Sequence, residues 1–246
     1  MFNYLLWYPL VILIFSILFS TETFANVKQE IKIAYLTQAV QAPAALSNLD
    51  PFIADKGLQG ALLGLKDNNT TGQFTGQSYS LKHLTIPVGG DVNAGFMALL
   101  KEGFQLVITQ LPADALQQLH AVNNNQALLF DVATRTDAFR YRQCLSNVLH
   151  LLPSRAMRAD ALAQYMLKKR WQRWFLVVGA SAEDALYAQA IKRAAKRFGV
   201  KIVAEKKWLH SYDARRTAQA DIPVFTQVDD YDVLVVADEQ GLFGEY

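Results

Sequence analysis

The sequence predicts an α/β protein with two Rossmann-like lobes, each built on a parallel sheet. Three observations predict this fold. Short apolar runs alternate with amphipathic stretches, the alternation occurs in two successive series, and 246 residues with 52% hydrophobic content suffice for buried cores. Apolar runs separated by helices are typical of parallel sheets that carry helices on both faces.

The first series begins with IKIAYLT at residues 31–37, an apolar run that predicts a buried strand, and a helix follows over 57–67. The amides, hydroxyls and glycine of DNNTTG (67–72) predict that this helix ends in a surface turn, because asparagine and glycine readily take the left-handed conformation. The rest of the series is expected as a strand at 81–88, a helix at 92–102 ended by Gly103, a strand at 104–111, a helix opened by PADA (112–115), and a strand at 127–132.

The second series follows the segment HLLPSRAM at 150–157, where we expect the chain to cross between lobes. Pro153 disfavours helix in the residue before it, and Ser154 can cap the next helix. The predicted division is a signal at 1–25, one lobe at 26–152 and a second lobe at 153–246. The second lobe is expected to contain helix 156–170, strand 174–179, helix 182–198 ended by Gly199, and strands 200–208 and 231–238.

The first 25 residues differ from the rest of the chain. An uncharged run of 16 residues, YLLWYPLVILIFSILF, precedes STETFA, in which Thr23 and Ala25 are small residues suited to a cleavage site. This pattern predicts a cleaved export signal and a periplasmic location. The segment ahead of the run contains no Lys or Arg, so an uncleaved membrane anchor remains the alternative.

Groupings of catalytic residues are absent from the sequence. The four histidines lie far apart, and there is no nucleophile elbow, phosphate-binding loop or CxxC pair. Asp229 and Asp230 adjoin each other in a predicted loop, where acids are usually solvated. The single cysteine, Cys144, is interpreted as a core residue. We therefore expect a protein that is not an enzyme and needs no cofactor or metal.

Charge is unevenly distributed along the chain. Residues 150–216 hold fifteen Lys/Arg and five Asp/Glu, whereas residues 217–246 hold no Lys/Arg and seven Asp/Glu. A basic block is one mark of nucleic-acid binding. Here its residues fall at a helix end and on one helix face, which favours solvated surfaces partly neutralised by the acidic segment, so no nucleic-acid partner is expected.

Loops that follow the predicted strands are the candidate ligand site, because open parallel sheets bind ligands beyond the carboxyl ends of their strands. In the first lobe these loops are 37–43, 110–114 and 131–139, and residues 180–184 of the second lobe can face them. Gln110, Thr134 and Thr136 can hydrogen-bond a small polar ligand, or they can simply cap helices.

Several strings in the chain resemble one branch of the periplasmic substrate-binding proteins of ABC transporters. It is the branch found with pyrroloquinoline-quinone-dependent alcohol dehydrogenase systems, within the branched-chain amino-acid-binding class. The resemblance runs from about Ile31 to Tyr246. The strings that carry it include LSNLDP, DNNTTG, LPADAL, LLHLLPSRAM, ADALAQYM, KRWQRWFLVVG, AAKRFGVKIV, DARRT, PVFTQ, YDVLVVADE and FGEY.

The resemblance implies a type I periplasmic binding protein fold, in which a hinge joins two lobes that clamp a ligand. It implies that Ala133 and Thr134, together with Gln110 and Leu111, hold polar groups of the ligand. LPADA replaces the serine-rich loop of amino-acid binders, so an amino-acid ligand is not implied. The family's chain returns to the first lobe after the strand resembling YDVLVVADE, whereas this chain stops at Tyr246, which predicts a truncated second lobe, lower stability or self-association.

The leading hypothesis is an exported solute-binding protein that delivers a small molecule to the membrane permease of an ABC transporter linked to quinone-dependent alcohol oxidation. An alternative is a non-transport accessory or sensor of a quinoprotein dehydrogenase system, with the basic block as its interface. A Rossmann-like enzyme that uses Asp229 or Asp230 is the weaker third reading.

Overall fold

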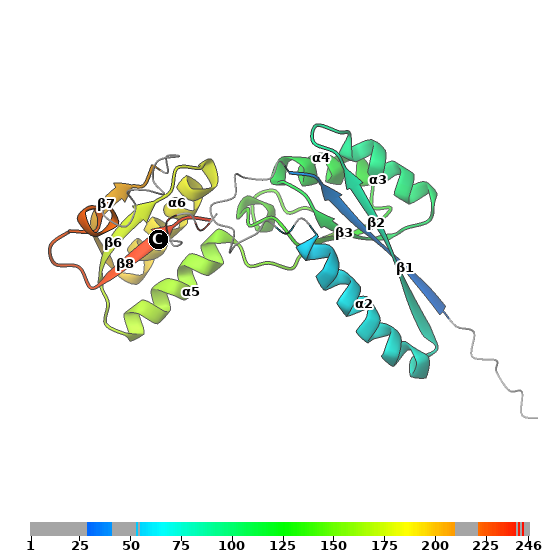
Figure 1. Ribbon diagram of the computed structural model, residues 1–246, viewed down its shortest axis with the longest axis horizontal. Coiled ribbons are helices and arrows are strands. Elements are labelled where there is room, and N and C mark those ends of the chain that lie inside the picture. The colour runs from blue at the N-terminus through cyan, green and yellow to red at the C-terminus, as the bar shows by residue number, and fades with distance from the viewer. Residues whose placement is uncertain are drawn as a thin grey trace, which may run out of the picture.

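The computed structural model describes residues 29–40, 53, 55–209, 221–239, 241 and 243, and the predicted export signal at 1–25 lies outside them. These residues form two parallel sheets, which lie toward opposite ends of an elongated molecule (Figure 1). Within this part of the chain, no helix combines the length and the apolar character that crossing a bilayer requires. The sheets are the expected consequence of the two apolar series in the sequence.

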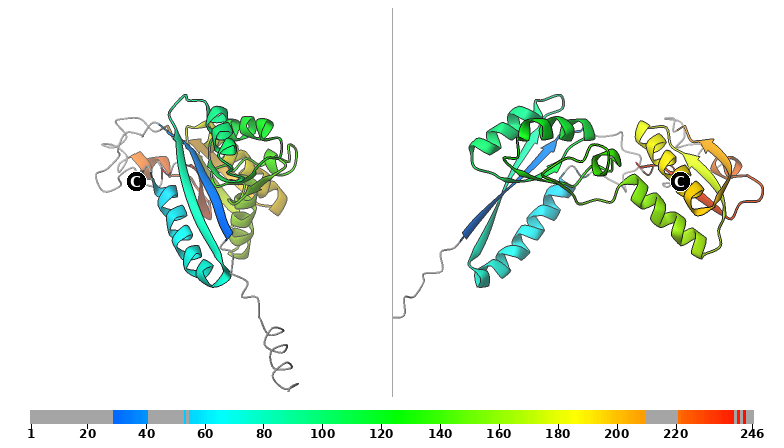
Figure 2. Two further views of the ribbon diagram at one scale, coloured as in Figure 1. Left: turned by 90° about the vertical axis from the view of Figure 1, so that its right-hand side faces the viewer. Right: turned by 180° about the vertical axis from the view of Figure 1, so that it is seen from behind.

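The first sheet has the strand order β2-β1-β3-β4-β5, and all its neighbouring strands are parallel. The chain passes from β1 outward to β2 and then back across β1 to β3, so α2 lies on the opposite face from α3 and α4 (Figures 1 and 2). The elements are β1 (Gln29–Gln38), α2 (Lys56–Thr75), β2 (Gln77–Ile86), α3 (Val92–Lys101), β3 (Leu106–Gln110), α4 (Ala113–Asn123), β4 (Leu128–Asp131), the 3-10 turn η2 (Ala138–Arg140) and β5 (Val148–His150).

The second sheet has the order β7-β6-β8 and is also parallel. Its central strand reads RWFLVV, and Trp174 to Val178 are all buried, as expected for a strand covered on both faces. Helices α5 and α6 pack on one face, and an aromatic cluster that includes Trp208 and Phe243 covers the other. The elements are α5 (Arg155–Lys168), β6 (Arg173–Val178), α6 (Ala182–Phe198), β7 (Lys201–Lys207) and β8 (Val233–Ala237).

Each sheet has its own hydrophobic core. In the first, Leu36, Val107 and Leu129 of adjacent strands pack with Phe96 of α3 and Leu116 of α4, all completely shielded from solvent. In the second, the small residues of α5 and α6, such as Ala163 and Ala194, are buried and allow the two helices to pack closely against each other. Separate cores around separate sheets are what the two-lobe prediction requires.

Most predicted helix ends are confirmed. Ser154 caps α5 by accepting a hydrogen bond from the backbone N–H of Met157. Ser181 and Asp184 form a reciprocal capping box at the start of α6, and Gly199 closes that helix in the left-handed conformation. Gly103 has a φ of 85°, one residue beyond the end of the α3 C-cap, where the sequence places it.

The prediction of a surface turn at DNNTTG is wrong. Helix α2 continues through this segment and ends only at Thr75, with Gly76 as its left-handed C-cap. The Asn69 side chain pairs with the backbone of Tyr79 on β2, accepting from its N–H at 2.8 Å and donating to its carbonyl at 2.9 Å. This tertiary contact, together with the close packing of Gly72 against Gln77, favours helix over the local preference of asparagine for turns.

Two other features differ from expectation. The sequence did not predict β5, whose three residues are too few to show a periodic pattern, nor η2 before it. Cys144 is exposed, not a core residue, because it lies in the irregular segment between these two elements.

The basic block is largely solvated and partly paired, as predicted. Arg193 and Arg197 on α6 both contact Asp160 on α5, and Lys192 pairs with Glu205. The acidic segment contributes Asp230, which pairs with Arg173. Surface pairs of this kind contribute little to stability, ~0.2–1 kcal/mol each, and they leave no continuous row of free cations on α6.

Candidate functional site

A cleft of about 790 Å³ lies between the carboxyl ends of the two sheets. Its larger wall belongs to the first sheet and the start of α2, and its smaller wall to α5, α6 and the segment after β8. The lining residues are Tyr35, Thr37, Gln38, Ala39, Val40, Ile53, Asp55, Gly57, Leu58, His83, Thr85, Gln110, Leu111, Pro112, Ala113, Ala133, Thr134, Arg135, Thr136, Arg155, Glu183, Leu186 and Glu239.

The position of the cleft follows from the strand order. In the first sheet, β2 is added on one side of β1 and β3 on the other, so the strand order reverses between β1 and β3. The loops that follow these two parallel strands therefore leave in opposite directions. The second sheet reverses in the same way between β6 and β8. Glu183 follows β6 and Glu239 follows β8, so both reversal points contribute residues to one cleft.

All five residues predicted to bind a ligand line this cleft. Gln110 ends β3 and Leu111 follows it, and Ala133, Thr134 and Thr136 follow β4. Gln110 is exposed and Thr136 half-buried, whereas Leu111 and Thr134 are buried. The structure brings the five together, and their role in binding remains a prediction.

The wall of the cleft near β1 is built around Tyr35, which sequence reasoning treated only as part of a buried strand. Its hydroxyl donates to Oε1 of Gln110, and burial raises the pKa of Tyr35 above its ordinary value of 10.0. Gly57 at the start of α2 packs so closely that an added Cβ would lie well inside 3.0 Å of both polar atoms. A glycine at this position therefore allows α2 to approach the Tyr35–Gln110 pair.

A second polar group forms the rim above β1 and β2. His83 Nε2 lies 3.2 Å from the Thr37 hydroxyl and 3.0 Å from the Thr85 hydroxyl, and the His83 and Tyr35 rings are tilted with centroids 5.5 Å apart. The register pairs Tyr35 with His83 and Thr37 with Thr85. Because residues two apart in a strand point to the same face, all four side chains lie on one face of the sheet. The rim offers both hydrogen-bond donors and acceptors.

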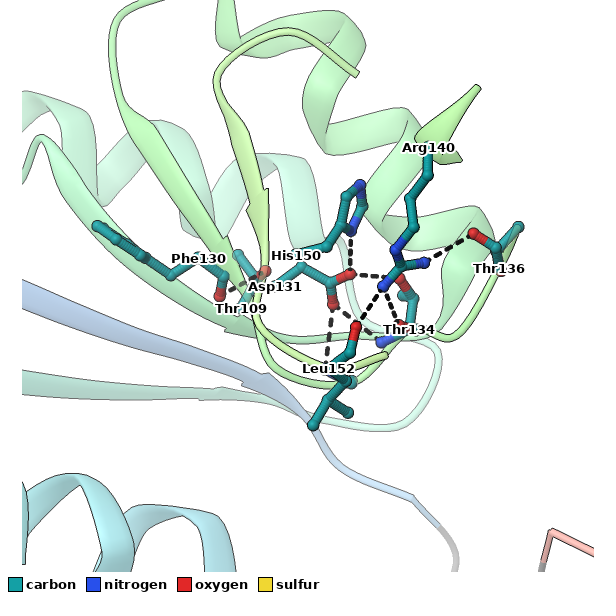
Figure 3. Close-up of polar contacts among 9 residues, drawn as sticks. Thr109, Phe130, Asp131, Thr134, Thr136, Arg140, His150 and Leu152 are labelled. Carbon is teal, nitrogen blue, oxygen red and sulfur yellow. Dashed lines mark hydrogen bonds and ion pairs between the residues drawn. The ribbon is translucent and has the colours of Figure 1, made fainter. Parts of the chain in front are cut away.

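Asp131, at the end of β4, fixes the loop that carries Ala133 and Thr134 (Figure 3). Its carboxylate is 1% exposed and accepts from the backbone N–H of Ala133 at 3.1 Å and of Thr134 at 2.9 Å. It also accepts from the Thr134 hydroxyl and lies 2.7 Å from Nδ1 of His150. Four contacts to one buried carboxylate leave the loop little freedom to change shape.

Arg140 connects the same loop to the segment before α5 (Figure 3). Its guanidinium donates to the carbonyl oxygens of Thr136 at 2.9 Å, Leu152 at 2.6 Å and Thr134 at 3.4 Å. Burial lowers the pKa of Arg140, and the carboxylates of Asp131 and Asp137 oppose this shift. Arg140 is thus used for structure and is not directed at the cleft.

The opposite wall contains a nearly buried ion pair. Arg155 Nη2 lies 2.8 Å from Oε2 of Glu239, and Arg158 contacts Oε1 of Glu239 at 3.5 Å. The backbone N–H of Glu239 donates to Asp184 of the α6 capping box at 2.8 Å. The sequence analysis did not identify Arg155 or Glu239 as site residues. Arg155 directly follows the predicted helix cap Ser154, and Glu239 directly follows the predicted strand 231–238.

Metal ligation is not indicated in the described ranges, where no group of three or more His, Cys, Asp or Glu side chains is placed to hold an ion. Asp131 and His150 contact each other, and the other hydrogen bonds of the Asp131 carboxylate come from Ala133 and Thr134, while the His150 ring stacks on Phe139. The cleft presents hydrogen-bonding groups and charged side chains.

Comparison with solved structures identifies the architecture. A substrate-binding protein of an ABC transporter from Desulfitobacterium hafniense, in complex with Leu, matches with a TM-score of 0.59 at 16% identity, covering 88% of this chain and 61% of that one. A periplasmic binding protein from Burkholderia mallei matches at 0.55 with 15% identity, covering 87% and 54%. A solute-binding protein of an ABC transporter from R. palustris, in complex with benzoate, matches at 0.54 with 12% identity, covering 84% and 55%.

No protein-family model matches the sequence, and no curated protein matches it either. The chain spans between 54% and 61% of the length of the three solved chains described above. At these identities the similarity concerns the fold. The chain therefore has the α/β architecture of the type I periplasmic binding proteins, which confirms the predicted fold class.

Proposed function

We propose that this protein is an exported solute-binding protein that captures a small molecule in its cleft and delivers it to the membrane permease of an ABC transporter. The observation that carries the proposal is that one cleft is lined from the carboxyl ends of both sheets. Two solved proteins of the same fold hold small molecules, Leu in one and benzoate in the other. Binding between two lobes requires neither bond chemistry nor a cofactor.

Gln110, Leu111, Ala133, Thr134 and Thr136 are proposed to contact the ligand. In the described part of the chain, the amide nitrogen of Gln110 and the hydroxyl of Thr136 have no protein partner, so both are available to a ligand. The Thr134 hydroxyl donates to Asp131, and it retains lone pairs that can accept from a ligand. Leu111 supplies apolar contact.

The proposed working parts are a cleaved export signal at 1–25, a first lobe at 26–152 and a second lobe at 153–246, with a periplasmic location. The lobes would close about the segment around Pro153, where the backbone N–H of Arg155 donates to the carbonyl oxygen of Arg135 and so joins the two proposed lobes. Closure would shield the ligand and strengthen its hydrogen bonds.

The link to pyrroloquinoline-quinone-dependent alcohol oxidation is a finer proposal, supported by the sequence strings alone. An accessory or sensor role in a quinoprotein dehydrogenase system is its alternative, and exposed cations such as Lys168 and Lys169 at the end of α5 would then form the interface. Co-purification of the chain with a permease rather than with a dehydrogenase separates the two roles.

The test is a thermal-shift screen of the full chain against amino acids, short alcohols, short acids and pyrroloquinoline quinone, followed by calorimetry of each hit. A ligand at a hundredfold excess over its dissociation constant stabilises the folded state by about 2.7 kcal/mol. Gln110→Leu and Thr136→Val should each weaken binding about tenfold, as expected for a lost hydrogen bond of ~1.4 kcal/mol. The matched control is Gln118→Leu, an exposed residue of α4 outside the cleft.

Two results would contradict the proposal. One is the absence of any hit from a folded chain with a cooperative melt. The other is a hit whose affinity is unchanged in both cleft variants, since the ligand would then bind elsewhere.

A further inference from the structure

We propose that Arg135 anchors the carboxylate of the ligand, and that the ligand is an organic monocarboxylate with an apolar body. This inference rests on the proposed function and specifies its substrate class. It begins from the charged side chains that line the cleft, which are Asp55, Arg135, Arg155, Glu183 and Glu239, with His83 at the rim.

Most of these charges are already neutralised or hydrogen-bonded. Arg155 pairs with Glu239, which also contacts Arg158. Asp55 accepts from the amide of Gln59 at 2.8 Å. Arg135 differs, because its guanidinium makes no hydrogen bond or ion pair within the described part of the chain.

The guanidinium of Arg135 is arranged to receive an anion. Its Nε is buried without a hydrogen-bond partner, whereas neither terminal nitrogen is among the buried unpaired atoms. The terminal nitrogens are therefore the accessible end of the side chain, and two of their N–H groups can donate to the two oxygens of one carboxylate. Neither terminal nitrogen has a partner among the described residues, so a bound carboxylate would meet donors that the protein does not use.

The backbone around Arg135 is fixed from both sides. The carbonyl oxygen of Arg135 accepts from the N–H of Arg155 at 3.0 Å, which ties it to the start of α5. Its neighbour Thr134 is held by Asp131, and Thr136 is held by Arg140. A cation on an immobile backbone loses little entropy when it binds a ligand, so this position suits an anchor.

The remaining walls determine what the carboxylate is attached to. Leu58, Leu111, Pro112 and Leu186 give the cleft apolar surface that inorganic phosphate or sulfate would not use. Glu183 lines the cleft from α6 and also has no side-chain partner in the described residues. A second carboxylate directed toward α6 would be repelled by Glu183, which favours monocarboxylates over dicarboxylates.

The experiment measures binding of defined probes to the full chain by calorimetry. Phenylacetate and hexanoate are the monocarboxylates, phenylacetamide and hexanol their uncharged counterparts, adipate the dicarboxylate, and inorganic phosphate the bare anion. We expect at least one monocarboxylate to bind, and to bind more tightly than its uncharged counterpart, adipate and phosphate. Arg135→Gln should weaken that binding 10- to 100-fold, about 1.4–2.8 kcal/mol, and Arg135→Lys should weaken it less.

Arg142→Gln is the matched control, because Arg142 is an exposed arginine of the following segment that does not line the cleft. If the Tm of Arg135→Gln equals that of the wild type, its weaker binding reflects a lost contact with the ligand and not a loss of folding. Tight binding of an uncharged probe that Arg135→Gln leaves unaltered would overturn the inference and leave the proposed function intact. Failure of charged and uncharged probes alike to bind a folded chain would count against both.

Discussion

Gly72→Ala in α2 is expected to destabilise the protein, although alanine is the better helix former. A Cβ at Gly72 would lie well inside 3.0 Å of the carbonyl oxygen of Gln77 and 3.1 Å from its carbonyl carbon. Both atoms belong to backbone, so relief requires α2 to move away from β2. Overpacking of this kind costs ~1–3 kcal/mol, and the helix preference of alanine offsets ~0.5–1 kcal/mol of it.

At the middle of these ranges the net loss is about 1.3 kcal/mol, which corresponds to a fall in Tm of about 3–5 °C for a protein of this size. Gly60→Ala and Gly64→Ala are matched controls in the same helix, because a Cβ at either position meets nothing within 4 Å. Both controls should raise Tm by about 1–4 °C. Thermal melts followed by circular dichroism would check the three variants, and a rise in Tm for Gly72→Ala equal to that of the controls would refute the proposed close packing of α2 on β2.

Three further predictions concern hydrogen bonds and pH. Asp131→Asn should cost about 3 kcal/mol of unfolding free energy in urea titrations, because the buried carboxylate is the common acceptor for its loop; a loss within error of zero would contradict this. Ser181→Ala should cost about 1 kcal/mol by removing the α6 capping box, and Ser181→Thr should restore most of it. Burial raises the pKa of Tyr35 in the folded state above its unfolded value of about 10, so the neutral phenol favours folding below about pH 10. This contribution to the free energy of unfolding is lost as pH rises through the folded pKa. Between about pH 9 and 11, Tyr35→Phe should therefore lose less stability than the wild type.

The fold was predictable because its signals are local. Apolar runs located the strands to within a few residues, and Ser154 and Gly199 marked helix ends through capping groups that lie next to them in sequence. Helix α2 was mispredicted because its deciding contacts are not local. Asn69 is held by Tyr79 on a neighbouring strand, and no sequence pattern within the helix records that contact.

The site was predictable in position but not in composition. Strand ends identified the loops that contain Gln110 and Thr134, because parallel strands place their carboxyl ends at one edge. The pairing of Tyr35 with Gln110 and of Asp131 with His150 joins residues from different strands, so it required the sheet register. Arg135 was overlooked for a related reason, since an unpaired cation is recognised only after every neighbouring charge has been assigned.

The polar groups behind the cleft determine the shape of its loop, whereas other residues at the cleft surface are available to contact the ligand. Asp131 and Arg140 use their hydrogen bonds on the protein itself and thereby determine the shape of the loop at 133–136. Groups already bonded to the protein gain little from a ligand, whereas Gln110, Thr136 and Arg135 retain free donors at the cleft surface. Specificity should therefore change when these three residues change, while changes at Asp131 and Arg140 should first alter stability and affect affinity only through the displaced loop.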